Sequence, residues 1–148
     1  MKHDALGSVD AVRGDNIVTV TWHGERRFEA GRSGAPTIRM DGDATTAPSP
    51  VDTLISALAG CTAVDVVDIL KKRRTEPTAL DMVITAQRAD GTPRRLVKVH
   101  LAYRITGGGV ERDHALRAIE LAVTKYCSVR DSLDPELPVT WSLELLPG

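Results

Sequence analysis

The feature that most constrains the fold is a run of apolar and small residues inside a predicted helix. Pro50 suits the first helical turn, Ser49 is a suitable N-cap, and Asp52 suits the positive end of the helix dipole. Across residues 54–64 every side of this helix is apolar or small, which is typical of a central helix covered on all sides. A chain of 148 residues has difficulty covering such a helix alone, so we expect an intertwined homodimer.

Strand-like segments precede and follow this helix. Short segments rich in β-branched residues, most of them separated by glycine-containing turns, occupy residues 8–12, 16–23, 26–30 and 37–40. In residues 16–23 apolar and polar side chains alternate, which predicts a strand with one buried face. Pro77 prevents the helix from continuing.

The second half of the chain predicts a hairpin, a helical region and a last strand. Residues 80–88 and 96–105 flank a turn, as in a β-hairpin. Helical spacing of apolar residues covers 111–126, a short helix follows over 127–133, and residues 139–145 alternate as a strand. This order predicts a single α+β domain over residues 1–148 with mostly antiparallel sheets.

Charge and composition exclude several classes of function. The chain has 19 basic and 20 acidic residues, and the scattered basic residues form no footprint for nucleic acid or an anionic membrane. The uncharged stretch at residues 53–64 is too short to span a bilayer, and no secretory signal is visible, so we expect a soluble cytoplasmic protein. The four histidines show no metal-binding spacing.

Two cysteines are the only groups suited to redox chemistry. Cys61 lies in the apolar helix, and Cys127 follows the second predicted helix. In a cytoplasmic protein such cysteines are more often buried, catalytic or redox-sensing than joined in a structural disulfide. The spacing alone leaves these alternatives open, since a cysteine in an apolar helix is usually a small core residue.

Three segments together resemble the OsmC/Ohr family, with a particular likeness to its YhfA-like branch. They are Ala47-Pro-Ser-Pro50, Leu58-Ala-Gly-Cys61 with the helix that follows it to Lys72, and Lys125-Tyr-Cys-Ser-Val129. The resemblance implies an α+β homodimer in which two long central helices are wrapped by two sheets, with sites at the subunit interface. It also implies a thiol peroxidase that needs no cofactor and favours small hydrophobic organic hydroperoxides. Cys61 would be peroxidatic and Cys127 resolving, and an external dithiol such as dihydrolipoamide would reduce the pair.

A peroxidatic cysteine must be a thiolate, and the chain around Cys61 does not favour one. Cys61 lies about three turns into its helix, too far for the N-terminal dipole to help, and Asp65 and Asp68 share its face. A cation is therefore expected from elsewhere in the fold. In the family an arginine held by a carboxylate performs this role.

Arg39 is the leading arginine candidate, because Ile38-Arg-Met-Asp-Gly42 resembles an Arg-aromatic-Glu-Gly stretch of OsmC proteins. Arg32 and Arg27 are weaker candidates. Peroxidatic members place Glu directly after the helix-opening proline, whereas this chain has Val51 there and Asp52 next. Asp52 is a candidate for the carboxylate, although a helical Asp52 would face away from Cys61.

This departure keeps a second function open. The same fold could bind an apolar small molecule at the subunit interface without any enzymatic role, and replacing Cys61 would then leave binding intact. A purely structural dimer is a third possibility. Fold alone does not choose among these functions.

Overall fold

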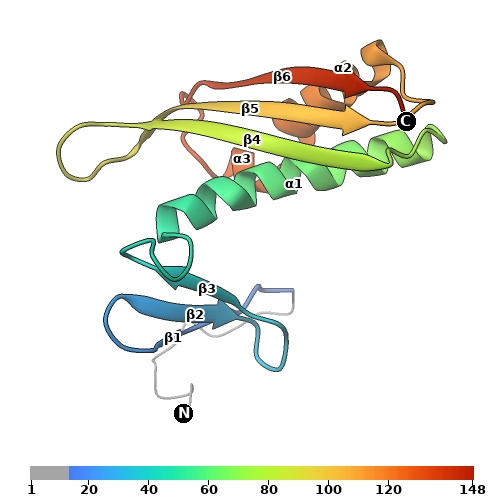
Figure 1. The fold of residues 1–148 in the computed structure, drawn as a ribbon. Coiled ribbons are helices and arrows are strands. Elements are labelled where there is room, and N and C mark those ends of the chain that lie inside the picture. The colour runs from blue at the N-terminus through green and yellow to red at the C-terminus, as the bar shows by residue number, and fades with distance from the viewer. Residues whose placement is uncertain (1–13) are drawn as a thin grey trace. The chain divides into compact units, whose positions relative to one another are not determined.

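The chain divides into two compact units, residues 1–53 and residues 54–148. The computed structural model describes residues 14–148 (Figure 1). The strand expected at residues 8–12 lies outside the described residues. The elements confirm an α+β protein with two small sheets.

A three-stranded antiparallel sheet forms the described part of the first unit. Its strands are β1 (Thr19–Trp22), β2 (Arg27–Gly31) and β3 (Ile38–Asp41), in the order β1-β2-β3. The cross-strand register gathers the apolar side chains on one face: Val20, Trp22, Phe28, Ala30, Ile38 and Met40.

The apolar face of this sheet is not fully covered in the single chain. Val20 is 54% exposed and Trp22 is 64% exposed. The expectation of a buried face for residues 16–23 is therefore wrong for one chain taken alone. The described part of the first unit contains no second sheet that could pack over this face.

The predicted central helix is α1 (Pro50–Lys72), and its first turn is held by a capping box. The Asp52 N–H donates to Ser49 Oγ at 3.0 Å, and the Ser49 N–H donates to Asp52 Oδ2 at 3.3 Å. At the other end Arg74 has a φ of 60°, and the Thr75 N–H donates to the Leu70 carbonyl at 2.9 Å. These contacts satisfy backbone groups that a helix end leaves without partners.

Within the second unit α1 has one buried face and one exposed face, although it is apolar on both. Leu58, Val66 and Leu70 are fully buried, whereas Leu54 is 39% exposed and Val64 is 60% exposed. A single chain therefore covers this helix on one face only, and cover of the other face by a second copy stays a prediction. By length and composition alone, α1 could also cross a membrane, a test that the core helices of soluble proteins pass too.

The second unit is a sheet covered by helices (Figure 1). Its strands are β4 (Ala79–Arg88), β5 (Leu96–Thr106) and β6 (Val139–Leu146), and α2 (Arg112–Leu121), the π-helix η2 (Ala122–Tyr126) and α3 (Ser128–Asp131) connect β5 to β6. The predicted hairpin is confirmed as β4 and β5. β6 lies parallel to β5, because the helical connection returns the chain to the end of the sheet where β5 begins.

A buried hydrogen-bonded chain ties α1 to this sheet. The Tyr103 hydroxyl on β5 donates to Thr62 Oγ1 on α1, and the Thr62 hydroxyl donates to the Ala59 carbonyl at 2.8 Å. Burial raises the pKa of Tyr103 to about 12 against the opposing effect of this hydrogen bond. Because Thr62 directly follows Cys61, the Tyr103–Thr62 hydrogen bond fixes the position of Cys61 relative to the sheet.

Replacing Thr62 with Val should lower the free energy of unfolding by about 1–3 kcal/mol, because the buried Tyr103 hydroxyl would lose its acceptor. Tyr103→Phe should cost about 1 kcal/mol, and the double variant should lose less than the sum of the two. Urea unfolding measures all three. The matched control is Thr85→Val on the exposed face of β4. An equal loss in Thr62→Val and this control would contradict the role of the contact.

Candidate functional site

Cys61 is positioned by the core helix. It lies on α1 between the exposed Gly60 and the buried Thr62, and its own side chain is half-buried. Leu58 and Val66 hold the helix in the core on either side of it. The cysteine therefore lies at the border between the packed face of α1 and its exposed face.

Cys127 is positioned by an irregular helix end. The sequence predicted one helix over residues 111–126, whereas the structure has α2 followed by η2, in which the Cys127 N–H donates to the Ala122 carbonyl at 2.9 Å. The Thr124 hydroxyl donates to the Glu120 carbonyl at 2.6 Å inside this turn. Such π-turns occur often at functional sites. Cys127 is then the N-cap of α3, where the Arg130 N–H donates to its sulfur at 3.2 Å.

The structure brings the two free thiols together within the second unit. Cys127 is 3% exposed, and its thiol is hydrogen-bonded to that of Cys61. Burial raises the pKa of Cys127 to about 11; the Arg130 N–H opposes this effect and the Cys61 thiol adds to it. Cys127 is therefore a neutral thiol at physiological pH, and it can donate its proton in a hydrogen bond to Cys61.

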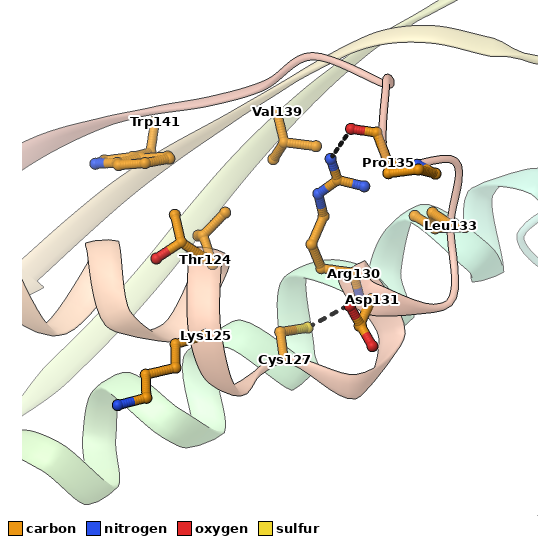
Figure 2. Close-up of a pocket in the computed structure, with 10 residues that line it drawn as sticks. Thr124, Lys125, Cys127, Arg130, Asp131, Leu133, Pro135, Val139 and Trp141 are labelled. Atoms are coloured by element: carbon orange, nitrogen blue, oxygen red, sulfur yellow. Dashed lines mark hydrogen bonds between the residues drawn. The ribbon is translucent and has the colours of Figure 1, made fainter.

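The guanidinium of Arg130, three residues after Cys127, is bound away from the sulfur. The Arg130 guanidinium donates to the carbonyls of Asp134 at 2.9 Å, Pro135 at 3.4 Å and Leu137 at 2.9 Å. Figure 2 shows it directed toward Pro135 and away from the sulfur. Arg130 therefore holds the loop between α3 and β6, while its backbone N–H contacts the cysteine.

A cavity of about 310 Å³ opens beside Cys127 (Figure 2). Its wall combines aliphatic and aromatic side chains with polar ones: Val123, Thr124, Lys125, Cys127, Arg130, Asp131, Leu133, Pro135, Val139 and Trp141. This volume is at the lower end of the range of small-molecule sites. No sequence pattern indicates this cavity, because its residues come from η2, α3, the following loop and β6.

Arg39 lies on β3 in the first unit, beside a carboxylate that the sequence did not single out. Glu29 is its cross-strand neighbour on β2. A hydrogen bond from Thr37, followed by the neighbouring His23 and Arg39, holds the pKa of Glu29 below its usual value. Only the pairing register of β2 and β3 could have identified this neighbour. Whether Arg39 meets the cysteines stays a prediction of the resemblance.

The loop after β3 is organised by a buried carboxylate. The N–H groups of Thr46 and Asp43 and the hydroxyls of Thr45 and Thr46 donate to Asp41, and they hold its pKa well below the usual range. These bonds fix the end of β3 two residues after Arg39. Asp52, the other carboxylate candidate, is part of the capping box of α1.

The two sheets, the core helix and the two neighbouring thiols define an α+β protein in which the half-buried Cys61 contacts the buried Cys127, and we call this pair the dithiol centre. The family model described as "OsmC-like protein" matches residues 41–142, so the chain belongs to the OsmC-like family. The three segments that carried the resemblance, from Ala47 to Val129, lie within this range, whereas Arg39 lies just before it.

Individual relatives agree with this assignment. The chain is 34% identical to protein YhfA of Escherichia coli K12 over 110 residues, which are 74% of this chain and 82% of YhfA. An OsmC-like protein from Mycoplasma pneumoniae has a TM-score of 0.76 at 15% identity, covering 91% and 99% of the two chains. The organic hydroperoxide resistance protein OhrB of Bacillus subtilis has a TM-score of 0.58 at 14% identity, covering 87% and 98%. The last two show that the fold is shared.

The raised pKa of Cys127 predicts how the thiol reacts as the pH changes. Alkylation by iodoacetamide should be very slow at neutral pH and should rise toward pH 11, because the thiolate is the reactive form and its pKa is raised to about 11. Peptide mapping by mass spectrometry measures the modification of each cysteine. The same chain unfolded in urea is the control, and its Cys127 should react at lower pH. Equal pH profiles in the folded and unfolded chains would contradict the burial of Cys127.

Proposed function

We propose that this protein is a thiol peroxidase that reduces small hydrophobic organic hydroperoxides in defence against oxidative stress. The observation that carries the proposal is the contact between the Cys61 and Cys127 thiols. A pair in contact can close a disulfide after one thiol has been oxidised. The name of OhrB, organic hydroperoxide resistance protein, supports this choice of substrate, because OhrB shares the fold.

In the proposed reaction Cys61 is peroxidatic and Cys127 is resolving. The Cys61 thiolate attacks one oxygen of the hydroperoxide and becomes a sulfenic acid, and the other oxygen leaves as an alkoxide that takes up a proton. Cys127 then attacks the sulfenic sulfur, so that a disulfide forms and water is released. The half-buried position of Cys61 and the deep burial of Cys127 favour this order over the reverse.

The proposal gives Arg39 the role of the cation that stabilises the Cys61 thiolate. Its place beside Glu29 supports this role, because a neighbouring carboxylate can orient a guanidinium. Asp52 remains part of the proposed site through the first turn of α1, which it caps together with Ser49. The hydrogen bond from Cys127 adds a second source of stabilisation for negative charge on the Cys61 sulfur.

We further propose that the protein acts as a cytoplasmic homodimer and that residues 1–148 form one domain within it. The exposed side chains of Trp22 on the first sheet and Val64 on α1 support this assembly, because a second copy would cover them. An external dithiol would reduce the disulfide after each turnover. Neither nucleic acid nor a membrane has a part in this function.

A second candidate function is the binding of an apolar small molecule without catalysis. The cavity beside Cys127 favours it, since Val139, Trp141 and Leu133 give the cavity an apolar wall. Replacement of Cys61 separates the two functions, because the peroxidase needs this thiol and the binding protein does not.

Titration of the reduced protein with an organic hydroperoxide tests the proposal. One equivalent of cumene hydroperoxide should remove both thiols of the chain, at a rate well above that of free cysteine. Cys61→Ser should abolish the fast reaction, whereas Cys127→Ser should still consume one peroxide and stop at the sulfenic acid. Thiol counting and a sulfenic-acid trap measure these outcomes. Thiol loss no faster than that of free cysteine would overturn the peroxidase assignment.

Replacing Arg39 with Gln tests the assigned cation. We expect the oxidation of Cys61 to slow about tenfold or more, because the variant removes the cation that the proposal assigns to the Cys61 thiolate. Stopped-flow thiol oxidation measures the rate. Arg32→Gln is the matched control, since Arg32 is an exposed arginine of the same unit that donates to Asn16 Oδ1. A larger loss in Arg32→Gln than in Arg39→Gln would remove Arg39 from the site.

A further inference from the structure

The two sulfurs of the dithiol centre have different surroundings. Cys127 lines the cavity of about 310 Å³, whereas Cys61 is not among the described residues that form its wall. In Figure 2 the side chain of Cys127 lies at the base of the space enclosed by Thr124, Asp131 and Val139. A molecule in this cavity therefore meets one sulfur of the pair and not the other.

We propose that the external reductant binds in this cavity and attacks the sulfur of Cys127 in the oxidised protein, so that Cys61 is the sulfur released first. This inference rests on the proposed function, since it describes how the disulfide formed by peroxide is reduced. It assigns the two half-reactions to two sides of the disulfide. Peroxide reacts at Cys61 on α1, and the reductant reacts at Cys127 through the cavity.

The atoms and electrons of the reduction balance with an aliphatic dithiol as the co-reactant. One thiolate of the dithiol bonds to Cys127 Sγ and breaks the bond to Cys61, which leaves as a thiolate and takes up a proton from water. The second thiol, after losing its proton to water, attacks the reductant's own sulfur in this mixed disulfide. It closes a cyclic disulfide and releases Cys127, which takes up a proton. Two electrons pass from the dithiol to the protein.

The chemistry of the leaving groups favours this direction of attack. Attack on Cys61 would expel Cys127 in a bimolecular first step, and burial raises the pKa of the Cys127 thiol to about 11, which makes it a poor leaving group. In the second step of the proposed route Cys127 does leave, but the attacking thiol is then tethered and acts at high effective concentration. The N–H groups of Arg130 and Val129 stabilise charge on the departing sulfur. A dithiol is therefore preferred to a monothiol.

The cavity walls suit such a co-reactant. Leu133, Val139 and Trp141 provide apolar surface for an alkyl chain. Arg130 keeps the wall in place, because its guanidinium binds three carbonyls of the loop that includes Pro135.

The first test identifies the sulfur that is attacked. The disulfide is formed with diamide, so that the experiment does not depend on peroxide reactivity. A short reaction with excess 2-mercaptoethanol, followed by acid quenching and peptide mapping, should find the first mixed disulfide on Cys127. A first adduct on Cys61 would overturn the proposal. Failure of peroxide to oxidise the protein would instead overturn the proposed function. The site of the first adduct could still be mapped in that case, because diamide forms the disulfide.

The second test fills the cavity. Asp131→Trp and Pro135→Trp add bulk from two exposed positions on its wall. Reduction of the diamide-oxidised chain by dithiothreitol should slow about tenfold or more, while oxidation of the reduced chain by cumene hydroperoxide keeps its rate. Val83→Trp is the control, because Val83 is 70% exposed and does not line this cavity. Unchanged reduction in both cavity variants, or equal slowing of the two half-reactions, would contradict the proposal.

Discussion

The contact between the Cys61 and Cys127 thiols is the interaction on which the chemistry of this fold depends. The two residues are far apart in sequence, and two structural devices bring them together. The buried Tyr103–Thr62 hydrogen bond ties α1 to the sheet beside Cys61. The π-turn before Cys127 ends α2 and makes the cysteine the N-cap of α3. Each device places one sulfur on a rigid element, which reduces the conformational freedom lost when a disulfide closes.

The same contact is asymmetric, and this asymmetry supports the different chemical roles that we propose for the two sulfurs. Cys127 is buried with a raised pKa, so it is a neutral donor toward Cys61 at physiological pH. Cys61 is half-buried on the border of the exposed face of α1. The cavity, in turn, is lined by Cys127. Oxidation at one sulfur and reduction at the other would keep the peroxide and the reductant from competing for one entrance.

Much of the fold followed from local sequence signals. Ser49 and Pro50 indicated the start of α1, and the alternation of apolar and polar residues indicated the hairpin strands. Both signals depend only on residues close together in the sequence. The parallel pairing of β6 was not predictable in this way, since alternation gives a strand but not its direction. The π-turn before Cys127 carries no spacing signal, and the neighbour of Arg39, Glu29, follows only from strand register. The cysteine pairing came from the resemblance.

Folding alone brings the two sulfurs of one chain into contact. The most direct measurement is mild diamide oxidation of the native protein followed by peptide mapping without reduction. We expect a link between the Cys61 and Cys127 peptides of the same chain that forms rapidly under native conditions and does not form when the chain is first unfolded in urea. Links that form only between chains, or only after unfolding, would contradict it.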